Sequence, residues 1–203
     1  MKIGEIDIPE QQTAHSVVTN AVYWVASILI GAAGGWTQEP AAMLMSALVA
    51  YALCQQCTGS IAFHFTADDQ IWAQLLDAVS IQWVMAALVA LSVHSAFDVT
   101  PWVLVPCVLG AWAFWWYAGD EVRRNPAVAV QVLVVVGLMG LSVGWGWALT
   151  CFFLIVLAVG VQLRTSTHSV WHSLWHILAG AGQALSGSLL ALHAGGITIP
   201  FPL

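Results

Sequence analysis

The sequence predicts an all-α integral membrane protein built as a bundle of seven transmembrane helices. Of its 203 residues, 60% are hydrophobic and only 7% are charged, whereas a soluble domain carries about 25% charged residues. So few charges could not keep a globule of this size in solution, and so apolar a chain is not disordered. Four Lys and Arg residues are too few for the basic surface of a nucleic-acid-binding protein. We therefore expect no nucleic-acid partner.

Polar and turn-forming residues divide the chain into seven apolar segments. The segments are residues 16–34, 41–66, 70–93, 101–117, 127–144, 145–163 and 170–193. Each is close to the roughly 17–25 residues with which a helix crosses a bilayer. The breaks at 34–40, 98–101 and 119–126 contain the Gly, Pro and Asp residues that end helices. We expect one domain, residues 1–203, with seven spans.

The break between the fifth and sixth segments is short, because only Gly144-Trp145-Gly146-Trp147 separates them. A single helix over both would be about 55 Å long, nearly twice the ~30 Å hydrocarbon core. The two glycines permit a tight turn, and tryptophan is typical of the membrane interface. The sequence therefore predicts two helices here.

The distribution of basic residues supports seven spans and predicts their orientation. With seven spans, the N-terminus and the loops after helices two, four and six lie on one side of the bilayer. All the basic residues fall there: Lys2, Arg123, Arg124 and Arg164. Because basic residues concentrate in cytoplasmic loops, we expect a cytoplasmic N-terminus and an external C-terminus.

Apart from His193 at the very end of the seventh segment, four acidic or histidine residues lie inside the predicted spans, where such groups are costly and usually functional. His172 and His176 are four residues apart, so they share one helix face. His64 ends the second segment and Asp77 lies about two turns into the third. Seven spans place all four at one side of the bilayer, within about 10 Å of its surface. His168 extends the row of histidines, whereas His94 and His193 lie at the opposite side and are interpreted as interfacial.

Three histidines with an open fourth position are typical of catalytic zinc sites, in which the metal activates a water molecule. A carboxylate such as Asp77 can accept the proton of that water. The hydroxyl of Ser60, four residues before His64, can donate to a developing oxyanion or to the carboxylate. Two alternatives stay open: a metal-free His and Asp proton relay, as in transporters, and purely structural hydrogen bonding.

Three blocks of the sequence resemble a known superfamily. They are Ser60-Ile-Ala-Phe-His64-Phe-Thr66, Gln74-Leu-Leu-Asp77 and Trp171-His172-Ser-Leu-Trp175-His176-Ile177. They resemble the signature blocks of the seven-helix membrane hydrolases that include alkaline ceramidases and adiponectin receptors. The residues in these three blocks are most similar to those of the alkaline ceramidase branch.

The resemblance implies one zinc ion per chain, held by His64, His172 and His176. It implies that Asp77 is the base and that Ser60 steadies the oxyanion or the aspartate. The implied reaction is amide hydrolysis of a ceramide-like membrane lipid, with the acyl chains lying among the helices. A receptor-like or haemolysin-like member acting on another lipid is the alternative within the superfamily.

The N-terminal acids and the residue after Asp77 depart from the ceramidase pattern. Ceramidases carry a calcium-binding acidic segment before the first helix. Here Glu5, Asp7 and Glu10 precede a helix whose apolar stretch has no carboxylate, so we interpret these acids as a solvated tail and not as a calcium site. Ala78 follows Asp77 where ceramidases carry an acid.

Compact loops and the lack of a eukaryotic retention signal favour a bacterial inner membrane. The sequence does not indicate an oligomeric state.

Overall fold

The computed structural model describes residues 2–3, 6–7, 10–65, 71–118, 127–162 and 170–201. Within these residues the chain is all-α, as predicted, apart from a two-residue antiparallel pair of strands ahead of the first helix. The elements are β1 (Lys2–Ile3), β2 (Ile6–Asp7), α1 (Glu10–Thr37), α2 (Pro40–Phe65), α3 (Ile71–Phe97), α4 (Pro101–Ala118), α5 (Ala127–Ser142), α6 (Trp145–Gln162) and α7 (Val170–Ala194).

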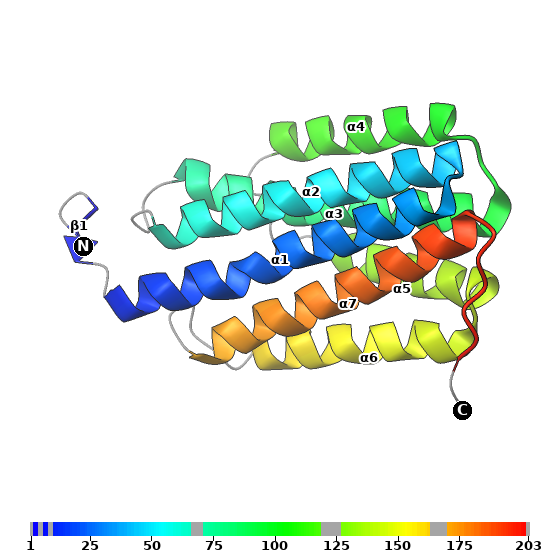
Figure 1. Ribbon diagram of the computed structural model, residues 1–203. Helices are drawn as coiled ribbons and strands as arrows, with labels where there is room; N and C mark the ends of the chain where they lie inside the picture. The colour runs from blue at the N-terminus through cyan, green and yellow to red at the C-terminus, as the bar shows by residue number, and fades with distance from the viewer. Residues whose placement is uncertain are drawn as a thin grey trace.

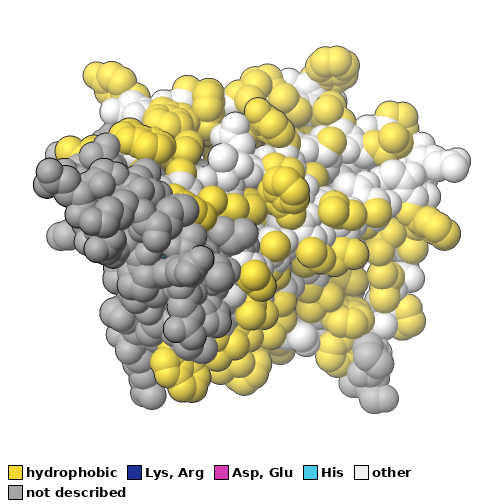
Figure 2. Space-filling model, turned by 60° about the vertical axis from the view of Figure 1, so that its left-hand side comes forward, with side chains coloured by type: hydrophobic (Ala, Val, Ile, Leu, Met, Phe, Trp, Pro, Cys, Tyr) yellow, Lys and Arg dark blue, Asp and Glu magenta, His cyan; other side chains and the backbone are white. Residues whose placement is uncertain are grey.

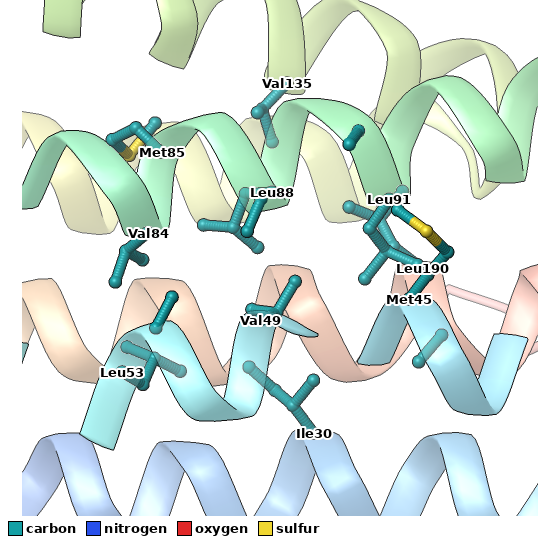
Figure 3. Packing of buried hydrophobic residues seen from close by; sticks show 14 of the residues in the cluster. Ile30, Met45, Val49, Leu53, Val84, Met85, Leu88, Leu91, Val135 and Leu190 are labelled. Carbon is teal, nitrogen blue, oxygen red and sulfur yellow. The ribbon is translucent and has the colours of Figure 1, made fainter. Parts of the chain in front are cut away.

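The helices form an antiparallel bundle in which α3 is central. Figure 1 shows the N-terminal strands at one end of the bundle and the end of the chain at the other. α3 packs against α2, α4, α5 and α7, whereas α1 packs against α2 and α7. Figure 3 shows α3 contributing Val84, Leu88 and Leu91 to an apolar layer that α1, α2, α5 and α7 complete.

The bundle carries apolar side chains outside and several polar ones inside. Large residues such as Trp24, Leu133 and Phe153 are more than half exposed, whereas Gln56 and Gln82 are buried. Figure 2 shows hydrophobic side chains spread over the described part of one face. A monomeric soluble protein rarely exposes apolar patches of this extent. This surface is compatible with a multi-pass membrane protein.

Within the described part of the chain, five helices are long and apolar enough to cross a membrane. They are α1 from Val18, α2, α3, α6 and α7 from Trp171. α4 and α5 are apolar but shorter; the 16 residues of α5 span about 24 Å, against a ~30 Å hydrocarbon core. The count of seven spans and the orientation of the termini therefore stay predictions. Arg123, Arg124 and Arg164 lie outside the described residues.

Two helices are longer than predicted because a change in hydropathy does not end a helix. α1 begins at Glu10 instead of residue 16, and α3 ends at Phe97 instead of residue 93. The backbone leaves the helix where a residue adopts positive φ, at Gln38 (55°) after α1 and at Asp98 (52°) after α3. Proline then occupies the first position of α2 and of α4, where its fixed φ suits a helix start.

α5 and α6 are separate helices, as the sequence predicted. α5 ends at Ser142, and α6 begins at Trp145. Gly144 makes the turn with a φ of 117°, which side chains with a Cβ rarely adopt. A Cβ atom at Gly140 would lie 2.7 Å from the ring of Trp145, so the absence of a side chain lets this ring fold back onto α5. The turn gives α7 the direction that brings its first turns to the end of α2.

Candidate metal centre

Three imidazoles from two helices converge at one end of the bundle. His64 lies in the last turn of α2, and His172 and His176 lie in the first two turns of α7. One ring nitrogen of each lies within 4.8 Å of the others. The Nε2 atoms of His172 and His176 are 3.0 Å apart. The ring of His64 meets both of the other rings edge to face, at centroid distances of 5.1 and 5.7 Å.

The spacing of these nitrogens is compatible with a divalent metal ion. Zn–N bonds of 2.0–2.1 Å in tetrahedral geometry place two ligand nitrogens about 3.3 Å apart. The 3.0 Å pair is already close to this value, and the separations of up to 4.8 Å need only small rotations of the imidazoles. Three neutral nitrogen donors suit zinc, but imidazole also binds copper, iron and nickel. The geometry therefore supports a metal site without selecting the metal.

A tyrosine from a third helix orients the most buried of the three imidazoles. The hydroxyl of Tyr23 on α1 lies 2.9 Å from Nδ1 of His176. Both side chains are buried, with exposed fractions of 0% and 3%. Their rings are nearly perpendicular, at 87°. Because the hydrogen bond occupies Nδ1, the Nε2 atom of His176 is the nitrogen turned toward His172 and the candidate metal position.

Ser60 lies one turn before His64, where α2 and α3 approach closely. A Cβ atom at Gly59 would lie 2.9 Å from the carbonyl oxygen of Leu76, a contact that only glycine permits without a shift. Leu76 immediately precedes Asp77, so the crossing brings the backbone around Ser60 next to the backbone around Asp77. Ser60 is buried, and its Oγ has no hydrogen-bond partner within the described part of the chain.

Asp77 lines a cavity that begins beside the three histidines. The cavity has a volume of about 550 Å³ and extends between α2, α3, α5, α6 and α7. Two of its lining residues also touch the imidazoles: Phe63 contacts His64, and Trp175 stacks on His172 and meets the ring of His176. Most of the remaining lining is apolar. The histidine group and the cavity therefore share Phe63 and Trp175 as neighbours.

The histidines at the opposite end of the bundle do not join this group. His94 is buried, 4% exposed, and its Nδ1 lies 2.9 Å from the carbonyl oxygen of Val99. His193 pairs through Nδ1 with Ser95 Oγ at 3.0 Å. His94 is thus packed within the end of the bundle, and its position at the membrane interface stays a prediction. His168 and Glu5 lie outside the described residues.

Sequence reasoning missed two residues that shape the site. Tyr23 is one of only three tyrosines in the chain, but nothing in its local sequence says that α1 packs against α7. Gly59 directly precedes Ser60, and its position inside a helix is the one signal that a close backbone contact was needed there.

A scan of the chain against protein-family models finds no match, and a search of the curated proteins finds no relative. The site and the resemblance of its three sequence blocks therefore provide the basis for a functional proposal.

Proposed function

We propose that the protein is a zinc-dependent hydrolase that cleaves the amide bond of ceramide-like N-acyl lipids within the membrane. The observation that supports this most directly is the position of the group His64, His172 and His176 beside a large apolar cavity lined by Asp77. A three-histidine donor set with a carboxylate and a lipid-sized cavity is what such a reaction requires.

The three histidines would hold the metal, and nearby polar residues would complete the reaction. Zinc bound there would supply a nucleophile at neutral pH, because zinc lowers the pKa of a bound water molecule. The carboxylate of Asp77 accepts the proton of the attacking water and returns it to the nitrogen of the leaving amine. The water oxygen thus forms a bond to the carbonyl carbon, the C–N bond breaks, and a fatty acid and a free amine leave.

Ser60 stabilises negative charge during the reaction, and Tyr23 orients the imidazole of His176. The Ser60 hydroxyl donates to the developing oxyanion or to the Asp77 carboxylate, which explains why a hydroxyl is buried there without a partner in the described chain. If Nε2 of His176 bound a metal, the proton of this imidazole would lie on Nδ1 and would be donated to the Tyr23 oxygen. Such a contact fixes the ring orientation of a metal ligand.

The cavity fits a lipid chain better than a polar metabolite. Its volume of about 550 Å³ lies within the 300–1,000 Å³ of most ligand sites. Val132, Ile155 and Val159 on α5 and α6 are among its apolar walls. With the scissile amide at the Asp77 end, an acyl chain extends toward the middle of the bundle.

A metal-free proton relay is the second candidate, and one observation favours it. Tyr23, His176 and His172 form a continuous hydrogen-bonded chain, with contacts of 2.9 and 3.0 Å. Such chains conduct protons in membrane transporters. However, a relay does not require the third imidazole of His64 to lie against the other two, so we favour the metal centre.

Elemental analysis of the purified protein, combined with a hydrolysis screen of labelled ceramides, tests the proposal. We expect about one zinc per chain together with release of fatty acid. A protein that is free of metal as purified and stays so after incubation with zinc would support the proton relay. Zinc without hydrolysis of any N-acyl lipid would support a receptor-like or haemolysin-like protein that acts on another lipid.

A further inference from the structure

Three of the five glutamines that line the same cavity are buried. Gln56, Gln82 and Gln183 come from α2, α3 and α7, and all three line the cavity. Their exposed fractions are 2%, 3% and 9%. The Gln183 amide nitrogen donates to Oε1 of Gln56 at 3.4 Å. We call these three residues the glutamine cluster.

The glutamine cluster lies deeper in the bundle than the reaction centre. Gln56 is eight residues from His64, and Gln183 is seven from His176, which correspond to about 12 and 10 Å along a helix. Gln82 is five residues beyond Asp77, or about 7.5 Å. A chain whose amide lies at Asp77 therefore passes the cluster part-way along its length.

An all-hydrocarbon chain is a poor partner for this cluster. Oε1 of Gln82 and Oε1 of Gln183 have no hydrogen-bond partner among the described residues. A buried amide group without a partner is unfavourable, and a neighbouring methylene group offers it nothing. A hydroxyl both donates and accepts, so it satisfies an amide whichever of its two polar atoms faces the cavity.

We propose that the glutamine cluster is a specificity site for a hydroxyl group carried part-way along the acyl chain of a lipid. The placement of that hydroxyl relative to the carbonyl rests on the proposed hydrolase function. Recognition of the hydroxyl itself rests only on the cluster and its cavity. Sites built to hydrogen-bond a ligand hydroxyl discriminate strongly against ligands that lack it, because their own polar groups are then left unpaired.

Equilibrium binding of matched ceramides tests the proposal. The probes share one acyl length and carry a hydroxyl next to the carbonyl, at mid-chain, or not at all; the three corresponding free fatty acids form a second set. Binding is measured on the purified Asp77→Asn protein, so that turnover does not consume the probe. We expect the mid-chain hydroxyl to strengthen binding by about ten-fold or more. Equal binding of the three probes, or binding of none in either set, would overturn the proposal.

Variants of the cluster identify the residues responsible. We combine Gln82→Leu or Gln183→Leu with Asp77→Asn. Each combination should abolish the preference for the mid-chain hydroxyl, while ceramides without a hydroxyl on the acyl chain should bind as well as before or better. Gln82→Met keeps an unbranched side chain of similar length and serves if the leucine variant does not fold. Gln131→Leu is the matched control, because Gln131 on α5 is not among the cavity-lining residues. A preference that survives in both cluster variants would contradict the assignment.

Hydrolysis by the unmodified protein separates this proposal from the proposed function. If the mid-chain hydroxyl ceramide binds preferentially but no ceramide is cleaved, the hydrolase proposal fails and the specificity site stands. If all three ceramides are cleaved at the same rate and bind equally, the specificity site fails and the hydrolase proposal stands.

Discussion

The hydroxyl of Tyr23 lies 2.9 Å from Nδ1 of His176, and this contact links the first helix of the chain to the last. It connects a buried phenol to one of the three imidazoles that face each other at the end of the bundle. α1 provides none of the three histidines, but through Tyr23 it determines how one of them is oriented.

Replacing Tyr23 by phenylalanine should weaken metal binding without unfolding the protein. The variant keeps the ring and loses only the oxygen that accepts from His176 Nδ1, and removal of such a contact typically lowers metal affinity 10- to 100-fold. Competition with a zinc chelator measures the change. Tyr51→Phe is the control, because Tyr51 is exposed on α2 and contacts Trp83 instead of the histidines. An unchanged zinc affinity for Tyr23→Phe would remove the orienting role.

Zinc content should depend on the clustered histidines and not on histidine number. We expect His64→Ala and His176→Ala to fall from about one zinc per chain to near zero, because two imidazoles alone do not complete a zinc site. His94→Ala should keep its zinc, although His94 is as buried as His176 and is hydrogen-bonded at the other end of the bundle. Elemental analysis of the three purified variants gives the answer, and loss of zinc from all three would point to general unfolding.

Asp77→Asn should retain zinc and lose hydrolysis. The asparagine side chain has the shape of the carboxylate but does not accept the proton of the attacking water. A positioned base raises the reaction rate by about 10²- to 10⁴-fold. Release of fatty acid from a labelled ceramide is the readout, with zinc content measured on the same sample. Asp98→Asn is a suitable control, because Asp98 is exposed at the far end and its positive φ suits asparagine. Normal hydrolysis by Asp77→Asn would mean that another group is the base.

Ser60→Ala should lower hydrolysis while leaving the protein as stable or more stable. A buried hydroxyl without a partner destabilises the fold by about 1–3 kcal/mol, so its removal costs no stability if its purpose is catalytic. Ser92→Ala provides the contrast: Ser92 is also fully buried, but its hydroxyl bonds the carbonyl oxygen of Val89 at 2.8 Å. Thermal unfolding in detergent and ceramide hydrolysis are compared for both. A marked loss of stability in Ser60→Ala would indicate a structural hydroxyl.

Gly59→Ala should destabilise the crossing of α2 and α3 and reduce hydrolysis. The added methyl group meets the Leu76 carbonyl oxygen at 2.9 Å, and overpacking of this kind costs about 1–3 kcal/mol. Gly110→Ala on α4 meets nothing within 4 Å and should be neutral or slightly stabilising, because alanine favours a helix by up to about 1 kcal/mol. Melting temperatures of the two variants should therefore change in opposite directions or by clearly different amounts.

The helices could be predicted from the sequence because a single local property, apolar content, marks them. The separation of α5 from α6 followed from Gly144, whose lack of a Cβ suits the positive φ found there. The extra length of α1 and α3 could not be predicted in this way. A helix continues through polar residues until the backbone turns, as it does at Gln38 and Asp98.

Part of the candidate site was also predictable, because it depends on spacing within one helix. His172 and His176 share a face through their four-residue separation, and His64 joins them because alternating helix directions bring the end of α2 to the start of α7. Tyr23 and the glutamine cluster were not predictable. Both depend on which face of one helix meets another, and the sequence of a helix that is apolar on all sides does not encode this.

The meeting of the end of α2 with the beginning of α7 also has a consequence for biosynthesis. His64 is synthesised early and His172 late, so a nascent chain that ends after α6 contains only one of the three clustered histidines. The complete three-histidine group exists only after α7 joins the bundle. If the three histidines hold an ion, its loading therefore follows the folding of α7 onto α2.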